Sequence, residues 1–247
     1  EKVEGAVVSS TLAFDATVGS LYPPLVCGGY VELLPDDDRL LGRLADCLLD
    51  QTRSLLFKIT PAHLKAIAND SALIPNPVSK HVVVIAGEQL TEKTLYRWKY
   101  ELLTAAELVN EYGPTEATVG STTYHGVVNQ TVNPDSLRGI PIGKPLDNIR
   151  LYVVNDHWHL QPVGVAGELY IGGECLAREY LNQPEMTAEK FIRSPIVLQG
   201  ENALAAIDVN TSTSANTNTS ASEEGERLYR TGDQVRWLPD GTIEFIG

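Results

Sequence analysis

Two short apolar segments, residues 55–59 and 81–85, constrain the fold of this chain more than any other feature. Each is long enough for a buried strand and too short for a buried helix. Each is followed by a threonine that predicts the start of a helix, Thr60 in one case and Thr91 in the other. Strand, helix, strand and helix in this order favour a parallel sheet with helices on its faces, in which ligands bind beyond the carboxyl ends of the strands.

The neighbouring sequence extends this pattern. Pro61 suits a first helical position, so we expect the first helix to run to about Asn69 and the second to reach Trp98. Residues 6–8 predict an earlier strand. After a polar break at residues 35–38, apolar side chains recur at helical spacing and predict a further helix. They are Leu40, Leu41, Leu44 and Leu48.

The second part of the sequence has a different pattern, with short strands and tight turns. Residues 149–154 and 167–171 each predict a strand, and Asp240 with Gly241 predicts a hairpin turn. Such a pattern is typical of a β-rich subdomain.

We therefore expect two domains: an α/β domain over residues 1–146 and a β-rich subdomain over residues 147–247. Within the second, residues 200–226 are rich in Asn, Thr, Ser and Ala. They offer too little apolar surface to offset the entropy cost of ordering, which predicts a flexible loop.

The composition excludes some classes of partner. A formal net charge of −13 argues against nucleic acid, because the phosphates would not be neutralised. No apolar stretch is long enough to cross a bilayer, and residues 1–5 lack a secretory signal. The cysteines are too few and too scattered for a disulfide framework. They are Cys27, Cys47 and Cys175. We expect a cytoplasmic protein without nucleic-acid or membrane partners.

The segment 110–116, Asn-Glu-Tyr-Gly-Pro-Thr-Glu, carries the strongest chemical signal. Gly113 begins a Gly-Pro turn whose backbone can approach a ligand closely. Tyr112 supplies a stacking face, Thr115 a hydroxyl, and Glu116 an oxygen ligand suited to magnesium. By itself the segment fits an ordinary Gly-Pro loop equally well.

Two further segments decide between these alternatives. Residues 167–191 and 229–247 follow residues 110–116, and together the three resemble core motifs of the adenylation domains of nonribosomal peptide synthetases. These domains belong to the adenylate-forming superfamily, with acyl-CoA synthetases and luciferases. The resemblance implies an α/β fold: part of the large N-terminal subdomain, with a parallel-type sheet layer followed by a β-rich distorted barrel.

The resemblance also implies residue roles in binding ATP and Mg²⁺. Tyr112 matches the tyrosine that stacks on adenine, Thr115 lies near the α-phosphate, and Glu116 helps to hold magnesium. Thr115 and Glu116 are thereby the catalytic candidates. Asp233 matches the aspartate that accepts the ribose hydroxyls, a role that suits a carboxylate. The remaining nucleotide-binding candidates are Gly87, Glu88, Asn110, Gly113 and Phe245, the last of which fits a core role equally well.

The sequence departs from the family pattern at Cys175 and Glu179, where glycines are usual. If those glycines adopt positive φ, we expect local strain at both positions.

The segment that begins at Phe14 resembles the motif whose aspartate, here Asp15, binds the substrate α-ammonium. A charge-assisted bond suits a buried ammonium. From the local sequence alone, a helix N-cap is an equally good interpretation of Asp15. Spacing from the motifs gives the other pocket positions. They are Ala16, Gly19, Lys58, Val84, Ala86, Glu111, Val119 and Gly120.

Lys58 and Glu111 stand out among these small and apolar residues. A side-chain amide accepts from Lys58 and donates to Glu111, whereas a carboxylate faces Glu111 as a like charge. The set is similar to family pockets for asparagine, with aspartate close behind. The small Gly19 and Ala16 leave room for glutamine or a modified asparagine. The alternative is that Lys58 and Glu111 neutralise each other and an unrelated side chain binds.

The resemblance implies a ligase that forms an aminoacyl-adenylate from an amino acid and ATP. The aminoacyl group then passes to the phosphopantetheine thiol of a peptidyl carrier protein, in a synthetase that also holds condensation domains. The family's phosphate loop, expected before Phe14, and its C-terminal lid with a catalytic lysine, expected after Gly247, are not in this sequence. We therefore expect the chain alone to be nearly inactive.

Two other functions remain open. One is an acyl-CoA or aryl-acid ligase, against which Asp15 and residues 178–191 argue. The other is a degenerate, non-catalytic scaffold. The first function requires that Asp15, Tyr112 and Asp233 converge on one cleft.

Overall fold

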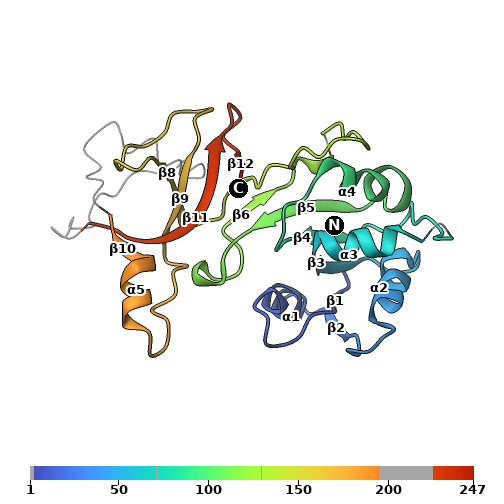
Figure 1. Ribbon diagram of the computed structural model, residues 1–247. Coiled ribbons are helices and arrows are strands. Elements are labelled where there is room, and N and C mark those ends of the chain that lie inside the picture. Colours follow the sequence, from blue (N-terminus) through green and yellow to red (C-terminus); the bar gives the residue numbers. More distant parts are fainter. Residues whose placement is uncertain (1–2, 71, 129, 195–224) are drawn as a thin grey trace. The chain divides into compact units, whose positions relative to one another are not determined.

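A computed structural model describes residues 3–70, 72–128, 130–194 and 225–247 (Figure 1). The chain forms two compact units. Unit 1 comprises Glu1–Tyr112 and Tyr124–Ile140, and unit 2 comprises Gly113–Thr123 and Pro141–Gly247. Most of the loop predicted at 200–226 lies outside the described residues.

Unit 1 contains a parallel sheet with the strand order β2-β1-β3-β4-β5. β1 and β3 are almost completely buried, as expected for strands covered on both faces, and buried and partly buried residues alternate in β4. This confirms the parallel sheet predicted from residues 55–59 and 81–85. The strands are β1 (Gly5–Val8), β2 (Tyr30–Leu33), β3 (Leu55–Ile59), β4 (Val82–Ile85) and β5 (Glu107–Tyr112).

Helices cover both faces of this sheet. Phe57 and Ile59 point into the main core, where they pack with α2 (Leu40–Leu49), α3 (Pro61–Ala68) and α4 (Glu92–Arg97). Lys58 alternates with them and therefore points to the opposite face, where it meets α1 (Ala16–Val26). The predicted residues Leu44 and Leu48 of α2 are fully buried.

The start of α3 follows the sequence prediction closely. The backbone N–H of His63 donates to Thr60 Oγ1 at 3.3 Å, and His63 Nδ1 accepts from the Thr60 backbone N–H at 3.2 Å. This reciprocal cap satisfies two of the donors that a helix start leaves unpaired. Thr91 caps α4 in a similar way through the backbone N–H of Thr94.

The end of α4 differs from the prediction. Instead of ending at Trp98, the chain continues as a π-helical turn, η1 (Trp98–Leu102). Trp98 is fully buried and donates its indole N–H to Leu64 O at 3.0 Å. The buried side chain therefore holds a turn that helical periodicity does not predict.

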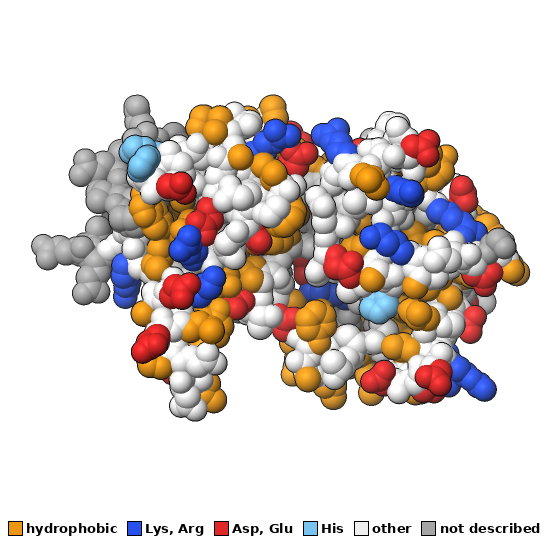
Figure 2. Space-filling model, in the orientation of Figure 1, with side chains coloured by type: hydrophobic (Ala, Val, Ile, Leu, Met, Phe, Trp, Pro, Cys, Tyr) orange, Lys and Arg blue, Asp and Glu red, His pale blue; other side chains and the backbone are white. Residues whose placement is uncertain are grey.

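Helix α1 carries an exposed apolar surface, which Figure 2 shows as hydrophobic side chains gathered over this helix. Its last turn contains Pro23 and Pro24, which normally mark the end of a helix. The exposed apolar side chains on and beside α1 are Leu12, Phe14, Val18, Tyr22, Leu25 and Val26.

Unit 2 contains an antiparallel sheet with the order β10-β11-β9-β8, and β12 pairs with β11. The predicted hairpin is the turn between β11 and β12. The expected fold class, an α/β part followed by a β-rich part, is confirmed. Unit 2 also contains residues 113–123 and 141–146, which lie outside the range 147–247 expected for the β-rich subdomain. The strands are β8 (Ile149–Val154), β9 (Gly167–Gly173), β10 (Phe191–Arg193), β11 (Arg227–Trp237) and β12 (Ile243–Phe245).

Short elements complete both units. Unit 2 has the helix α5 (Pro184–Lys190), the 3-10 turn η2 (Thr115–Ala117) and the paired strands β6 (Thr122–Tyr124) and β7 (Lys144–Pro145). Unit 1 has the 3-10 turn η3 (Gly126–Val128). In the part of the chain that the structure describes, every helix is too short or too polar to cross a membrane.

Candidate functional site

Asp15 stands immediately before α1, at the N-cap position, yet its side chain makes no capping hydrogen bond. Other side chains hold this end of the helix: Thr17 is buried, and its hydroxyl donates to Thr11 O at 2.8 Å and contacts Ser10 Oγ at 2.7 Å. The N-cap interpretation of Asp15 is therefore not supported by its geometry. Asp15 is half-buried.

Lys58 and Glu111 form a buried ion pair between β3 and β5. Lys58 Nζ donates to Glu111 Oε1, and the two side chains are only 5% and 14% exposed. Val84 lies beside Lys58 in the register of β3 and β4, so it borders the pair. Two of the pocket residues predicted from spacing thus neutralise each other, and a third lies next to them.

Gly19 makes room for the Lys58 side chain. A Cβ atom at Gly19 would lie 3.0 Å from Lys58 Cδ and 3.3 Å from Lys58 Nζ. Ala16 is one turn earlier in the same helix. The missing side chain at Gly19 therefore lets the Lys58 ammonium reach Glu111 along the surface of α1.

The chain turns sharply where β4 ends. The backbone N–H of Ala86 donates to Ile59 O at 3.0 Å, and Gly87 adopts a φ of +89°, which favours glycine. Glu88 follows and is exposed. Burial lowers the pKa of nearby His63, and the negative charge of Glu88 opposes that shift.

The end of β5 places Asn110 and Tyr112 in different environments. Asn110 is buried, and its side-chain N–H donates to Ile140 O at 3.2 Å. Tyr112, the last residue of β5, is half-buried. The Asn110 side chain therefore links Ile140 to the strand.

In unit 2, Gly113 allows a tight turn. A Cβ atom at Gly113 would lie 2.5 Å from Val119 O and 2.7 Å from both Gly120 Cα and Ser121 N. Thr118 and Val119 both adopt positive φ, at 57° and 72°. Strained backbone of this kind persists only where surrounding contacts fix it, and it is common at functional sites.

Glu116 lies within this turn and is held at both its side chain and its backbone. The Tyr180 hydroxyl donates to Glu116 Oε1 at 2.5 Å, and the Ala177 backbone N–H donates to Glu116 O at 2.7 Å. Thr118 Oγ1 donates to Cys175 O at 2.5 Å. The segment 175–180 is therefore bonded to the turn at several points.

Sequence reasoning assigned no role to Tyr180, although it belongs to a recognised motif. It is separated from Glu116 by more than sixty residues, and only the fold brings the two together. Desolvation and the bond to Glu116 raise the pKa of Tyr180, which keeps its hydroxyl protonated as a donor. No local pattern in the sequence marks this contact.

The strain expected at Cys175 and Glu179 is absent. Neither residue has positive φ, and both adopt backbone conformations open to any side chain. The positive-φ positions nearby are Gly173 and Asn182 instead. The replacement of glycine at 175 and 179 therefore costs no backbone strain.

Asp233 lies at an irregularity in β11. The pairing of β11 with β9 shifts between Arg230 and Gln234, and Gly232 adopts a φ of +85°. Thr231 Oγ1 accepts from the Asp233 backbone N–H at 3.0 Å and donates to Leu169 O at 2.7 Å. This bulge fixes the backbone of the predicted ribose-binding aspartate.

Phe245 lies on β12 in register with Val235, close in the sheet to the bulge at Asp233. Its side chain is half-buried, whereas Val235 is fully buried. The position of Phe245 is compatible with both interpretations of this residue, a core side chain and one that flanks a ligand.

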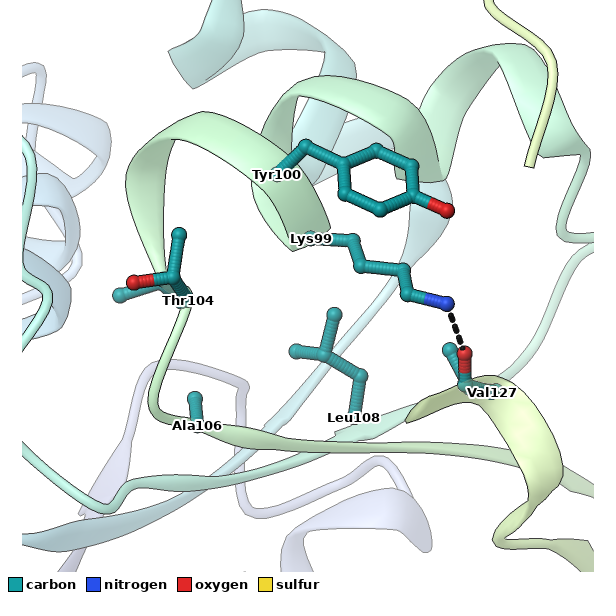
Figure 3. Close-up of a pocket in the computed structure, with 7 residues that line it drawn as sticks. Lys99, Tyr100, Thr104, Ala106, Leu108 and Val127 are labelled. Atoms are coloured by element: carbon teal, nitrogen blue, oxygen red, sulfur yellow. Dashed lines mark hydrogen bonds between the residues drawn. The ribbon is translucent and has the colours of Figure 1, made fainter. Parts of the chain in front are cut away.

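A separate pocket of about 270 Å³ lies in unit 1 beside the π-helical turn. Lys99 crosses it and donates to Val127 O at 2.6 Å, and Tyr100, Thr104 and Leu108 also line it (Figure 3). None of the predicted site residues belongs to this pocket.

Within unit 1, then, Gly19, Lys58, Val84 and Glu111 lie together. Within unit 2, the turn of Gly113, Glu116, Val119 and Gly120 is one cluster, and the bulge at Asp233 with Phe245 is another. The convergence of Asp15, Tyr112 and Asp233 on one cleft stays a prediction.

Comparison with known proteins identifies the family of this chain. Residues 4–181 match the family described as AMP-binding enzyme. The chain is 36% identical over 238 residues to tyrocidine synthase 3 of Brevibacillus parabrevis and 33% identical over 247 residues to bacitracin synthase 3 of Bacillus licheniformis. The alignments cover 96% and 100% of this chain, but only 3% of each relative. The chain thus spans a very small part of the length of these curated relatives.

Solved structures support the same fold. The nonribosomal peptide synthetase FmoA3 in its AMPPNP-bound form is similar over the whole of this chain, with a TM-score of 0.76 and 27% identity, and 24% of that protein is covered. An artificially fused adenylation–PCP di-domain, NpsA-ThdA from Klebsiella oxytoca, shares the fold with a TM-score of 0.74 at 20% identity, over 43% of its length. The chain therefore belongs to the AMP-binding enzyme family and is part of an adenylation domain of the nonribosomal peptide synthetase type.

Proposed function

We propose that this chain provides the amino-acid pocket and most of the nucleotide contacts of a domain that converts an amino acid and ATP into an aminoacyl-adenylate and pyrophosphate. The substrate carboxylate attacks the α-phosphate, and the bond to pyrophosphate breaks. Because neither reactant needs a covalent bond to the protein, the domain acts by positioning the reactants and by stabilising charge. The observation that carries the proposal is the buried Lys58–Glu111 pair beside Gly19 in the predicted pocket.

Asp15 is the proposed partner of the substrate α-ammonium. An ammonium removed from water needs a charged partner, and a carboxylate gives a stronger bond than a neutral acceptor. Support comes from its half-buried side chain, which the helix does not use as a cap. A substrate without an amino group would leave this charge unpaired, which disfavours acyl and aryl acids.

The proposed side-chain specificity is for asparagine or a related amide. Lys58 has three N–H donors, and the bond to Glu111 Oε1 uses one of them. An amide can therefore accept a bond from Lys58 and donate one to the Glu111 carboxylate without separating the pair. An aspartate carboxylate would meet Glu111 as a like charge, and an apolar side chain would leave polar groups unpaired.

The small residues Ala16 and Gly19 on α1 leave space beside this pair, which extends the proposal to glutamine and to modified asparagine. Val84 and Ala86 form the proposed apolar border within unit 1, and Val119 and Gly120 of the Gly113 turn are proposed pocket residues on the family pattern. Small and apolar residues around one ion pair favour a substrate with a single polar group, because additional polar atoms would lack partners.

Glu116 is the proposed magnesium ligand. No group of three or more His, Cys, Asp or Glu side chains gathers as a metal site among the described residues. Magnesium in nucleotide enzymes is commonly held by one or two carboxylates together with phosphate oxygens and water, so a single glutamate fits it. When bound, the ion would neutralise phosphate charge, and Thr115 would supply a hydroxyl close to the α-phosphate.

The remaining nucleotide roles are proposed on the family pattern and on local geometry. Tyr112 offers a half-buried ring for adenine, and Asp233 offers a carboxylate for the ribose hydroxyls. The fixed bulge around Asp233 supports this role, because a ligand contact needs a defined backbone. Gly87, Glu88, Asn110, Gly113 and Phe245 complete the proposed nucleotide set.

The proposed acceptor of the aminoacyl group is the phosphopantetheine thiol of a peptidyl carrier protein, with condensation domains in the same synthetase. Support comes from the relatives, which are peptide synthases many times longer than this chain, and from the fold shared with an adenylation–PCP di-domain.

An amino-acid panel in ATP–pyrophosphate exchange tests the function, with the complete adenylation domain as the enzyme. We expect asparagine to give the fastest exchange, glutamine and aspartate to be slower, and benzoate or fatty acids to give none. Exchange that is faster with an aryl or acyl acid than with every amino acid would assign the domain to an acid ligase. Absence of exchange with all substrates would favour a non-catalytic scaffold.

The substitution Asp15→Asn sharpens this test because it removes the charge and keeps the shape. We expect kcat/KM for asparagine to fall about a hundredfold, the loss typical when a buried charge loses its partner. Exposed Asp135→Asn is the matched control and should leave exchange unchanged.

A further inference from the structure

We propose that Tyr180 is a positioning residue for Glu116: its hydroxyl holds the carboxylate in the orientation that receives magnesium with bound nucleotide. The inference rests on the proposed function, in which Glu116 is the metal ligand. The contact that motivates it is the hydrogen bond of 2.5 Å from the Tyr180 hydroxyl to Glu116 Oε1.

A phenol is a suitable partner for a carboxylate that must bind a cation. Its hydrogen bond fixes the orientation of the carboxylate, and the phenol adds no positive charge. A lysine or arginine in the same place would neutralise Glu116 and compete with the metal ion. Partners that orient a metal ligand without replacing the metal often set the affinity of the site.

Tyr180 is itself fixed from several directions. Its backbone N–H donates to Thr187 Oγ1 at 3.0 Å, and that hydroxyl donates to Gln183 O at 2.8 Å at the start of α5. Its ring packs against Phe191, with 5.6 Å between the ring centroids. Tyr229 also packs on Phe191, at 5.2 Å. A hydroxyl on a ring held in this way has little freedom to follow a moving carboxylate.

The backbone around Tyr180 is tied to the Glu116 turn independently of the hydroxyl. Ala177 N–H donates to Glu116 O at 2.7 Å, and Arg227 donates to the carbonyl oxygens of Ala177 at 2.7 Å and Arg178 at 2.5 Å. The Arg227 guanidinium also lies over the Phe191 ring, 4.3 Å from its centroid. The turn therefore has other anchors, and removal of the hydroxyl alone should leave the fold intact.

The substitution Tyr180→Phe distinguishes a role in orienting the Glu116 carboxylate from a role in stabilising the fold. It keeps the ring, the packing on Phe191 and the backbone bonds. It removes the donor to Glu116 and the contact of the same hydroxyl with Tyr229. We expect the metal affinity of the nucleotide complex to fall about tenfold, as for loss of other partners that orient metal ligands. Binding of AMPPNP without metal, and the KM for the amino acid, should stay within about twofold of the wild type, which is about 0.4 kcal/mol or less.

Tyr152→Phe is the matched control. The Tyr152 hydroxyl donates to Glu226 Oε2 at 2.5 Å, so this variant also removes a tyrosine–glutamate bond in unit 2, but one that does not involve Glu116. We expect its metal affinity to equal that of the wild type. Thermal unfolding of both variants checks that each is folded.

The measurement is a titration with Mn²⁺ as the probe, in the presence of saturating AMPPNP, followed by water-proton relaxation. It detects weak metal binding and needs no turnover. The wild type, Tyr180→Phe, Glu116→Gln and the double variant form a cycle. We expect Tyr180→Phe to weaken Mn²⁺ binding in the wild type and to have no further effect once Glu116 is changed.

The outcomes separate the two proposals. If the wild type binds Mn²⁺ with AMPPNP and Tyr180→Phe binds it equally well, Tyr180 does not position Glu116, and the proposed function is unaffected. If Tyr180→Phe lowers the Mn²⁺ affinity equally in the wild type and in Glu116→Gln, the positioning role is also overturned. If neither the wild type nor Glu116→Gln shows metal-dependent binding, the metal role of Glu116 fails and the role of Tyr180 fails with it.

Discussion

Glu111 and Glu116 are five residues apart in the chain, yet their carboxylates have different partners in the two units. In unit 1, Glu111 is buried and paired with the ammonium of Lys58, so its charge is neutralised within the protein. In unit 2, Glu116 receives a hydrogen bond from the phenol of Tyr180, which brings no positive charge. Both carboxylates have a side-chain partner, but among the residues that the structure describes, an ion pair is found at Glu111 and not at Glu116.

The comparison teaches how the same side chain serves two purposes. A carboxylate that is already neutralised suits recognition of a neutral polar group, because an arriving cation would have to displace Lys58. A carboxylate that is oriented but not neutralised suits a cation. The partner, not the glutamate, therefore determines the kind of ligand that each region is built to bind.

The largest effect should come from separating the pair in unit 1. Lys58→Met removes the cation and keeps most of the volume, so Glu111 stays buried without a partner. We expect the free energy of unfolding to fall by about 3 kcal/mol, measured by urea denaturation. Adding Glu111→Gln should restore most of this stability, because no buried charge then remains. A double variant as unstable as Lys58→Met would show that lost packing, rather than the unpaired charge, is the cause.

The next prediction concerns the turn that carries Glu116. Gly113→Ala introduces a Cβ atom 2.5 Å from Val119 O, and backbone atoms cannot move away as a flexible side chain can. We expect unfolding free energy to fall by about 2 kcal/mol and nucleotide binding to weaken. Gly42→Ala is the control, since nothing lies within 4 Å of its new atom in α2. That variant should gain about 0.5 kcal/mol from helix propensity. Equal effects of the two substitutions would contradict the steric account of the turn.

The third prediction concerns the pH dependence of stability that arises from two buried histidines of unit 1. Burial lowers the pKa of His81, whose Nδ1 accepts the Leu55 backbone N–H at 3.0 Å, and burial also lowers the pKa of His63. Below pH 6.5 the unfolded chain takes up protons that these folded residues do not. Stability should therefore fall between about pH 7 and about pH 5.5, by up to about 1.4 kcal/mol per pH unit for each histidine.

Urea unfolding across this pH range provides the measurement. His125→Gln is the control, because the side chain of His125 is exposed and lies outside the core. Asp50 does not contribute to the pH dependence of stability in this range. Hydrogen bonds from Thr52 lower its pKa to about 2, so the stability that it provides is lost only in stronger acid. A stability that stays flat as the pH falls through this range would show that neither buried histidine is held neutral by the fold.

The smallest effect on stability, with a larger one on specificity, is expected at Gly19. Gly19→Ala places a Cβ atom 3.0 Å from Lys58 Cδ, and the flexible lysine can shift by a few tenths of an ångström. The gain in helix propensity and this crowding nearly cancel, so unfolding free energy should change by less than about 1 kcal/mol. In pyrophosphate exchange, the ratio of asparagine to aspartate activation should change more than stability does. An unchanged ratio would place Lys58 outside the specificity pocket.

Much of the fold follows from local sequence. The apolar segments 55–59 and 81–85 form β3 and β4, Thr60 begins α3 with a reciprocal cap, and Asp240 with Gly241 forms the β11–β12 turn. In each case a few neighbouring residues carry the pattern from which the element is predicted. Distant contacts act in the same direction, as in the pairing of β3 with β1 and β4.

Other features depend on distant contacts and could not be predicted. Helix α1 has Pro23 and Pro24 within its last turn and several exposed apolar side chains, so the local sequence does not mark it as a helix. The π-helical turn exists because Trp98 packs in the core. The bond between Tyr180 and Glu116 joins segments that only the fold brings together. The prediction of strain at Cys175 and Glu179 was wrong, because the positive φ angles in this segment are at Gly173 and Asn182.

The order in which the chain visits its two units has a practical consequence for engineering. The polypeptide leaves unit 1 after Tyr112, returns after Thr123 and leaves again after Ile140. No single splice can therefore exchange one unit for that of a relative. A chimera that exchanges unit 2 must transplant residues 113–123 together with residues 141–247. Otherwise it will combine the Glu116 turn of one lineage with the Tyr180 segment of another.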